Sequence, residues 1–320
     1  MDSTPTSSPA KERTTVAWPL FHQDWWLDAV SPGGWDVATV RQDDRVVARL
    51  PYVRVPRFGG NVLTMPPLTQ FLGPWIAPLE GKNSTQLTRE HELNEELIGG
   101  LPEHASFFAK CSPQVANVLP FIWAGFETSV RYTYRIEELS DADAIWKNYR
   151  ESARRQIRKA KKQVELRDDL GVERFLELNR MTFERQNQSL PYEEALVRRL
   201  DEACTVQDCR RILFAVDEND RVHGALYLVW DADVCYYLMS GGDPDLRNSG
   251  AMSLLIHEAI TRASETSKIF DFEGSMIRPI ERFFRSFGAA QQPYIVLERR
   301  GRLAKLKRAL SDAASCLRSL

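Results

Sequence analysis

The sequence predicts an α+β chain made of two similar halves, because its length suits two domains and one pattern of elements occurs twice. The 320 residues are about twice a typical domain length. Hydrophobic residues make up 43% and charged residues 27% of the chain, which is ordinary for a globular protein with a hydrophobic core. Residues 40–53 (VRQDDRVVARLPYV) and 216–229 (VDENDRVHGALYLV) match at six positions with a constant offset of 176. We therefore expect one structural unit to be present in two copies.

Each copy of the repeat has the pattern of a β-hairpin. Two β-rich runs flank a turn rich in Asp and Asn, whose short side chains tolerate left-handed backbone dihedrals. A helix candidate precedes each hairpin, at residues 24–30 and 172–187, and a third strand follows each one. We expect these third strands to end at the glycine pairs Gly59-Gly60 and Gly241-Gly242. The boundary between the halves is expected near residue 140.

The second half shows the fuller series of elements. Before its hairpin, a helix capped by Asp143 or Ser152 is expected to end at about Lys162, before a short strand at residues 164–166. After the third strand, a glycine-bearing loop at residues 241–250 leads into a helix. The later elements that we expect are a helix at 251–263, a strand at 268–274, a helix at 279–287 and a strand at 294–299.

This order of elements resembles the GNAT acyltransferase fold. The segment Arg247-Asn248-Ser249-Gly250-Ala251 is similar to the R/Q-x-x-G-x-G/A phosphate loop of that family, although Met252 stands at its last small position. Glycines let backbone N–H groups approach a pyrophosphate, and the N-terminus of the following helix adds a partial positive charge. The resemblance implies that Arg247 and Gly250 bind the phosphates of a donor. The alternative interpretation is a simple connection between a strand and a helix.

From about residue 18 to residue 299, the chain resembles the FemAB-like and BioF2-like acetyltransferases, GNAT-superfamily relatives of the Fem-type peptidyltransferases. Besides the hairpins, the segments that carry this resemblance are 152–162 (SARRQIRKAKK), 270–275 (FDFEGS), 283–288 (FFRSFG) and 65–74 (MPPLTQFLGP). It implies two tandem GNAT-like subdomains, at residues 16–140 and 141–299, each a mixed, mostly antiparallel twisted sheet flanked by helices. Residues 1–15 are expected to be a disordered lead and residues 300–320 a basic amphipathic helix.

Basic residues are concentrated between residues 147 and 162, where eight Lys or Arg stand against one acid. Arg154, Arg158 and Lys162 recur at helical spacing and would share a face suited to a polyanion, such as a CoA phosphate, a nucleotide-sugar pyrophosphate or a tRNA backbone. The resemblance to the Fem-type R-x-I-R-K-A motif adds Lys159 to this set. The alternative is a solvated charged face of the helix.

Two carboxylates, Asp271 and Glu273, alternate along the strand expected at residues 268–274, so we expect them to share one face. One of them could accept a proton from an attacking amine. We prefer Glu273 because it is nearer the end of the strand. The alternative is that these carboxylates cap a helix or form salt bridges with nearby arginines.

The resemblance also implies roles for the pair Phe284-Arg285. Fem-type enzymes carry a Phe-Lys pair in this region that stabilises the oxyanion of the acyl group. Arg285 would supply a fixed positive charge to that oxygen but could not donate a proton at neutral pH, and the alternative is an ordinary surface residue. For the acceptor we predict contacts with Gln70, Tyr192 and Tyr237, although the segment around Gln70 could equally be a packing seam between the halves.

Together these expectations predict an N-acyltransferase. An acyl or aminoacyl group would pass from acyl-CoA or aminoacyl-tRNA to an amine acceptor, with no tightly bound cofactor and no metal. The acceptor would be a small molecule or a nucleotide-linked compound, such as a peptidoglycan precursor peptide or an amino sugar. Neither half contains the long helical hairpin that helps some Fem-type members bind tRNA, which favours acyl-CoA. The alternative is a non-catalytic binding module for RNA or another phosphate-bearing ligand.

Charge and hydropathy exclude other classes of protein. The net charge of −2 argues against a protein that coats nucleic acid or an anionic membrane, and no apolar stretch approaches the roughly 18 residues of a membrane span. Five scattered cysteines suit reduced thiols, so we expect a cytoplasmic protein. The helix expected at 300–320 would dock on the protein or, as the alternative, contact the surface of the inner membrane.

Overall fold

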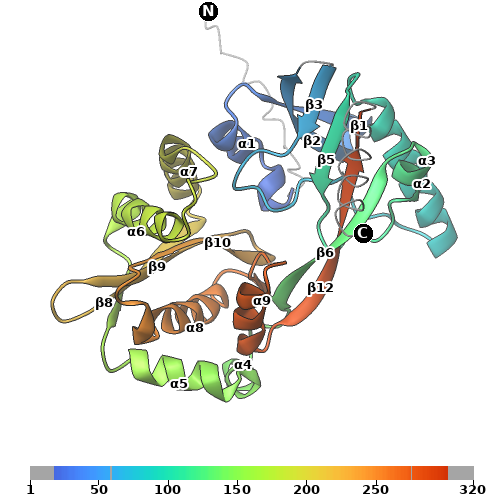
Figure 1. Cartoon of the computed structure of the whole chain (residues 1–320). Coiled ribbons are helices and arrows are strands. Elements are labelled where there is room, and N and C mark those ends of the chain that lie inside the picture. The colour runs from blue at the N-terminus through green and yellow to red at the C-terminus, as the bar shows by residue number, and fades with distance from the viewer. Residues whose placement is uncertain (1–17, 58–59, 275, 302–320) are drawn as a thin grey trace, which may run out of the picture.

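The computed structural model describes residues 18–57, 60–274 and 276–301. The lead expected at residues 1–15 and nearly all of the helix expected at residues 300–320 lie outside the described residues. In the described part of the chain, twelve strands form one continuous twisted sheet with helices on both of its faces (Figure 1). The α+β class and the mixed, mostly antiparallel sheet are therefore confirmed.

The two halves present the same series of elements: a helical segment, three antiparallel strands, then helix, strand, helix and strand. The N-terminal half contains η1 (Leu20–His22), α1 (Asp24–Val30), β1 (Trp35–Gln42), β2 (Arg45–Arg57), β3 (Gly60–Thr64), β4 (Trp75–Ile76), α2 (Asn83–Gly99), β5 (Ser106–Lys110), α3 (Leu119–Trp123) and β6 (Glu127–Ile136). The C-terminal half contains α4 (Ala142–Asn148), α5 (Glu151–Ala160), β7 (Glu165–Arg167), α6 (Gly171–Arg185), α7 (Glu194–Val206), β8 (Arg210–Val216), β9 (Val222–Trp230), β10 (Val234–Gly242), η2 (Arg247–Ser249), α8 (Ala251–Ala263), β11 (Ile269–Asp271), α9 (Arg278–Phe284), η3 (Arg285–Phe287) and β12 (Ala290–Arg299).

The order of the strands shows how the halves are joined. It is β1-β2-β3-β5-β12-β6-β11-β10-β9-β8-β7, with β4 paired to β2. The last strand of each half crosses into the other: β12 pairs with both β5 and β6, and β6 pairs with both β12 and β11. The sequence predicts a sheet for each half, whereas this exchange of strands merges them into a single sheet.

The two repeated hairpins have turns of different length, residues 43–44 in the first and 217–221 in the second, but they share one left-handed position. Asp44 and Asp220 both adopt left-handed dihedrals, with φ of 62° and 58°, as the Asp-rich turn predicts. The glycine pairs, however, are not equivalent. The pair Gly241-Gly242 ends β10, but Gly60 begins β3. The prediction for the first half is wrong because the second strand of its hairpin extends as far as Arg57.

Two further elements differ from the prediction. The helix expected to end at Lys162 is divided into α4 and α5, because Tyr149 and Arg150 adopt extended dihedrals, with ψ of 139° and 149°. Asp141, rather than Asp143 or Ser152, caps the first of these helices: its side chain accepts a hydrogen bond from the Ala144 backbone at 2.9 Å. The strand expected at residues 268–274 stops at Asp271.

Helices cover both faces of the sheet (Figure 1), and hydrophobic side chains fill the space between helices and strands. On one face, α1, α6 and α7 cover a cluster that includes Trp26 and Phe175. On the other, α5, α8 and α9 cover a cluster that includes Leu255 and Phe272. Each fully buried side chain of this size contributes about 1.5–3 kcal/mol, so the central strands are a rigid base for the loops at their ends. No helix among the described residues is long and apolar enough to span a bilayer.

Candidate active site

The site begins where parallel strands separate. β10 and β11 pair only from Val234 to Tyr236, and β10 then continues to Gly242 paired with β9 on its other side. The equivalent strands of the first half, β3 and β5, are likewise parallel over a short register, at Val62 and Leu63. Each half therefore has an opening in the sheet beside the end of its short parallel pair.

Each opening holds a cavity. Cavity A, of about 710 Å³, is lined by the end of β10, residues 272–274 and α9. Cavity B, of about 430 Å³, is lined by residues 64–70, by the end of β5 and by Pro191 and Tyr192. The residues that line both cavities are Gln70, Lys110, Leu238 and Glu273. A groove between the halves thus has its centre at these four residues.

Glu273 lies at the junction of the two cavities with its backbone fixed on both sides. Its N–H donates to Asp271 Oδ1 at 2.8 Å, and its carbonyl accepts from Gln70 Nε2 at 2.9 Å. Its φ of 56° is in the left-handed region, which is strained for a residue other than glycine. Gly274 follows with φ of 54°, and a Cβ there would lie 2.2 Å from the Tyr132 carbonyl oxygen. Only glycine allows the chain to pass β6 so closely.

The Glu273 carboxyl group is held in an unusual electrostatic environment. Its Oε1 is buried with no hydrogen-bond partner among the described residues. Burial raises the pKa of this carboxyl well above its usual range, nearby Asp271 raises it further, and Lys110 opposes the shift. A carboxyl whose pKa is raised in this way binds a proton more strongly than a free carboxyl, which suits a general base once it is ionised.

Asp271 is buried in the protein instead of facing the site beside Glu273. It is fully buried and forms a salt bridge with Arg135 at 2.7 Å, and it also accepts from the Thr133 hydroxyl. It lines neither cavity. The expectation that Asp271 and Glu273 share one face is wrong, because β11 ends at Asp271 and Glu273 turns out of the strand. Asp271 anchors β11 to β6 and positions the Glu273 amide.

The cations of the site come from residues that the sequence pattern did not indicate. Lys110, at the end of β5, lines both cavities, and Arg131, on β6, lines cavity A. Burial lowers the pKa of Lys110, Arg131 lowers it further, and Glu273 opposes the shift. The duplication was the signal that could have found Lys110, because β5 and β11 occupy equivalent places and Lys110 and Glu273 stand at their ends.

Arg285 lies outside both cavities. It forms a salt bridge with Glu281 at 2.8 Å and its side chain is 48% exposed. Its neighbour Phe284 does line cavity A, where its ring lies 5.5 Å from that of Tyr237. The structure therefore does not bring Arg285 to either cavity: Phe284, the last residue of α9, lines cavity A, and Arg285 after it is paired at the surface.

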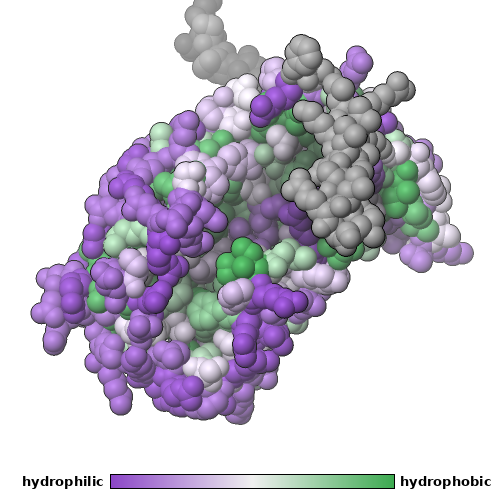
Figure 2. All heavy atoms as spheres, viewed as in Figure 1, coloured by the Kyte–Doolittle hydropathy of each residue, from purple (hydrophilic) through white to green (hydrophobic). Residues whose placement is uncertain are grey.

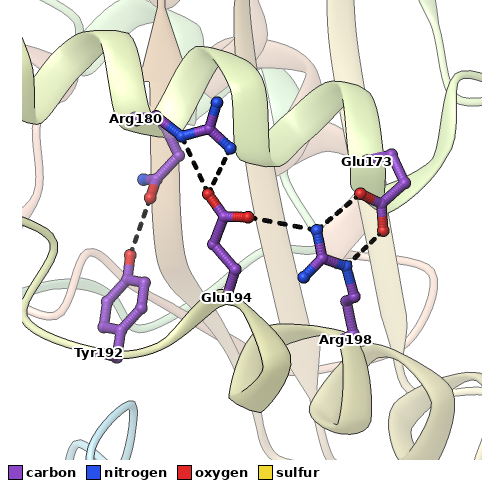
Figure 3. Close-up of polar contacts among 6 residues, drawn as sticks. Glu173, Arg180, Tyr192, Glu194 and Arg198 are labelled. Carbon is purple, nitrogen blue, oxygen red and sulfur yellow. Dashed lines mark hydrogen bonds and ion pairs between the residues drawn. The ribbon is translucent and has the colours of Figure 1, made fainter.

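The two predicted tyrosines both line the groove. Tyr237 lines cavity A and Tyr192 lines cavity B, and burial raises the pKa of each to about 12. The Tyr192 hydroxyl donates to Asn179 Oδ1 at 3.1 Å. Figure 3 shows this contact beside a network of ion pairs that joins α6 to α7 through Arg180, Glu194, Arg198 and Glu173. The loop that carries Tyr192 is thus held at both ends.

The predicted basic residues surround the phosphate-like loop rather than the cavities. Arg154 and Arg158 pair with Glu151, and Lys162 is exposed. Lys159 Nζ donates to the Asn248 carbonyl in η2.

The loop that contains Arg247 and Gly250 packs tightly on α5. Gly250, with φ of 85°, lies so close to α5 that a Cβ would be 2.5 Å from the Gln156 carbonyl oxygen. Arg247, in the same loop, is exposed. The loop and α5 form one surface, next to the far end of β10.

Apolar side chains form the rim of cavity A. Met276, Ile277 and Ile280 line the cavity and are exposed. This side of the molecule is largely hydrophilic, but apolar residues gather near its middle, over α9 (Figure 2). The groove thus combines a charged floor with an apolar entrance. No group of three or more His, Cys, Asp or Glu side chains in the described part of the chain could hold a metal ion.

Comparison with known proteins identifies the class of this fold. Residues 147–278 match the family model of the acetyltransferase (GNAT) domain. No curated protein sequence matches the chain. The C-terminal half is thus similar to the acetyltransferase (GNAT) domain over these residues.

Similar solved structures extend over both halves. FemX matches with a TM-score of 0.64 and 11% identity, over 86% of this chain and 91% of its own. The C-terminal domain of a putative lysylphosphatidylglycerol synthetase from Agrobacterium fabrum matches with a TM-score of 0.54 and 13% identity, over 92% and 93%. A tandem GNAT protein from the clavulanic acid biosynthesis pathway matches with a TM-score of 0.50 and 12% identity, over 86% of each chain. Over the described residues of both halves, the chain has a fold similar to that of FemX and the tandem GNAT protein, and the expected resemblance is confirmed.

Proposed function

We propose that this protein is an N-acyltransferase whose reaction takes place where cavities A and B meet. The observation that carries the proposal is the Glu273 carboxylate, which has a buried oxygen without a hydrogen-bond partner among the described residues, at the junction of the two cavities. A buried acceptor without a donor is costly unless a ligand supplies one. The N–H of an acceptor amine would supply it.

The donor would lie in cavity A and the acceptor in cavity B. β10 leads from cavity A to the loop that contains Arg247 and Gly250, next to the basic helix α5. An acyl group in cavity A could therefore be attached to a phosphate-bearing carrier held at that loop. Cavity B would place the acceptor between Gln70 and Tyr192, with its nitrogen directed at Glu273.

The chemistry would be direct transfer between two bound substrates. The amine nitrogen attacks the acyl carbon and forms the new C–N bond, and Glu273 takes the proton that the nitrogen loses. The bond from the acyl carbon to the carrier breaks, and the carrier leaves as a thiol or a ribose hydroxyl after protonation. Lys110 and Arg131 place positive charge where negative charge develops on the acyl oxygen.

The preferred donor is acyl-CoA, in keeping with the GNAT domain at residues 147–278. Aminoacyl-tRNA is the second candidate, because α5 leaves Arg155, Lys161 and Lys162 exposed to a larger polyanion. For the acceptor we propose a small-molecule amine or a nucleotide-linked one, such as a peptidoglycan precursor peptide or an amino sugar. We place this reaction in the cytoplasm, where these donors are made.

The proposal is tested by incubating the purified protein with acyl-CoA thioesters or aminoacyl-tRNA and a panel of amines. Amine-dependent release of free thiol or deacylated tRNA, with the N-acyl product seen by mass spectrometry, is the expected result. Glu273→Gln should reduce the rate by at least ~100-fold with donor affinity little changed. The matched control Glu265→Gln, in the exposed turn after α8, should keep full activity. Donor binding with no turnover for any amine would instead support a binding module.

A further inference from the structure

A third cavity lies at the other end of β10. Cavity C, of about 430 Å³, is lined by Val234 and Tyr236, whereas Tyr237 and Ser240 line cavity A. Because strand residues advance by ~3.3 Å each, the outer ends of these two sets are ~20 Å apart. Cavity C is bounded by residues of η1, by the segment after Gln70, by α2 and by the turn before β10. It thus lies between the halves, and its volume suits a small-molecule ligand.

Aromatic rings make up much of the wall of cavity C. The aromatic side chains that line it are Trp18, Phe21, Phe71, Trp75 and Tyr236. They are held by contacts with one another: the ring of Phe21 lies 4.7 Å from that of Tyr236, and the ring of Phe71 lies 6.4 Å from it. Aromatic faces carry partial negative charge and attract cations.

The charged residues in the wall of cavity C are all acidic. They are Glu90, Asp231 and Asp233, and no Lys or Arg in the described part of the chain lines this cavity. Asp233 is neutralised by Lys268 at 2.7 Å. Glu90 accepts only a long hydrogen bond, at 3.3 Å, from the neutral Asn117 amide. The cavity therefore carries uncompensated negative charge.

Nearby basic groups do not cancel this charge. His22 lines the cavity, but burial and the neighbouring Arg49 lower its pKa to about 3, so its ring is neutral at physiological pH. Arg49 itself stacks on Trp18 at 3.6 Å and is paired with Asp24 at 2.9 Å. The positive charge behind the wall is thus already matched by a carboxylate.

Two buried polar groups in the wall have no hydrogen-bond partner within the part of the chain that the structure describes. Asn94, 1% exposed, has an unpartnered Oδ1, and His22, 4% exposed, has an unpartnered Nδ1. Both residues line cavity C. Buried polar groups without partners are rare in native proteins, and a bound ligand is one way to satisfy them.

We propose that cavity C is a second ligand site, which binds an organic cation: an ammonium group on a compact hydrophobic body. The aromatic rings and Glu90 would hold the charge, and Asn94 Oδ1 would accept from an N–H where the ammonium carries one. The site is separate from Glu273 and does not depend on the transferase reaction proposed above.

The test uses benzyltrimethylammonium as the probe, with benzyl alcohol and benzoate as neutral and anionic controls, in calorimetric titrations of the full chain. The cation should bind at least ~10-fold more tightly than the alcohol, and benzoate should not bind. Equal affinity for the cation and the alcohol, or no measurable binding of the cation at millimolar concentration, would overturn the proposal.

Variants then locate the bound probe. Glu90→Gln should weaken binding at least ~3-fold, and Val115→Trp, which fills the cavity from a surface loop, should abolish it. The matched control Glu95→Gln, exposed on the same helix, should bind normally. Glu273→Gln should also bind normally, so this site can stand even if the transferase reaction fails. Binding that survives both Glu90→Gln and Val115→Trp, or that is lost in Glu273→Gln, would place the probe elsewhere and reject the proposal.

Discussion

At the scale of single residues, Glu273 shows how backbone strain can serve a site. A left-handed dihedral costs a residue other than glycine of the order of 1–3 kcal/mol. Hydrogen bonds to Asp271 and from Gln70 hold the backbone in this state. The turn directs the carboxylate to the place where the cavities meet, instead of leaving it on the face of β11. Local strain and an unpartnered oxygen thus coincide at the residue proposed to accept the proton.

The raised pKa of Glu273 predicts a stability that depends on pH. An unfolded glutamate titrates near pH 4.3, and burial raises the folded value. The stability that this group contributes is therefore present below the unfolded pKa and is lost as the pH rises through the folded pKa. Glutamine cannot ionise, so near pH 4 the melting temperature of Glu273→Gln should be close to that of the wild type. Towards pH 8 the variant should melt at a progressively higher temperature than the wild type.

Differential scanning calorimetry across this pH range measures the effect. Glu265→Gln, which is exposed, should show a difference from the wild type that changes little with pH. A wild type more stable than Glu273→Gln at pH 8 would show that Lys110 stabilises the carboxylate more than burial destabilises it.

The sequence predicted some residues of the site but not its cations. Glu273, Gln70, Tyr192, Tyr237 and Phe284 were predicted and do line the cavities. The cations could not be predicted from local pattern, since the residues that the structure brings to Glu273 come from β5 and β6 of the other half. Only pairing between distant strands places them there.

At the scale of elements, binding experiments can decide whether the basic helix α5 contacts the donor. Its buried face, Ala153, Ile157 and Ala160, packs on α8, and its basic face is solvated or binds phosphate. Arg158→Glu combined with Lys162→Glu should weaken affinity for a phosphate-bearing donor at least tenfold, about 1.4 kcal/mol. The melting temperature should change little, because both side chains are exposed.

Equilibrium binding of CoA, acyl-CoA and tRNA to this double variant checks the prediction. Arg174→Glu, on the exposed surface of α6, is a control of the same charge change away from the loop. Unaltered affinity for every phosphate-bearing donor would show that α5 is not part of the binding site and that its basic face is only solvated.

Elements with a strong local pattern were predicted well. α1 and α8 have the expected bounds, because each combines a clear periodicity with a turn or glycine at one end. The early end of β11 was not predicted. Residues 270–274 alternate as a strand does, but the chain leaves the sheet where Asp271 finds Arg135 and Gly274 must pass β6. Tertiary contacts thus override the local alternation.

At the scale of the whole molecule, the duplication determines where the site can form. Because β12 and β6 exchange between the halves, the equivalent ends of β5 and β11 both lie close to this central pair. Lys110 and Glu273 then meet from opposite halves, and both line cavity A. The repeat could be recognised in the sequence, but the exchange could not, since it depends on the pairing of strands 150 or more residues apart.

The exchange predicts that neither half folds alone. A fragment that ends at residue 140 would lack β12, which pairs with both β5 and β6. A fragment that begins at residue 141 would lack β6, the strand that links β11 to β12, and would bury Asp271 without its Arg135 partner. Removal of one member of a buried ion pair typically costs about 3–5 kcal/mol, a large part of the stability of an ordinary domain.

Each fragment expressed alone should therefore be insoluble or lack a cooperative melting transition. Fragments expressed together should form a soluble one-to-one complex, because the β12–β6 pairing and the salt bridge between Arg135 and Asp271 can re-form without the peptide link at residue 140. Size-exclusion chromatography and circular dichroism measure both outcomes. A monomeric fragment that melts cooperatively by itself would show that a half closes its own sheet, and Glu273 would then not need the other half for its position.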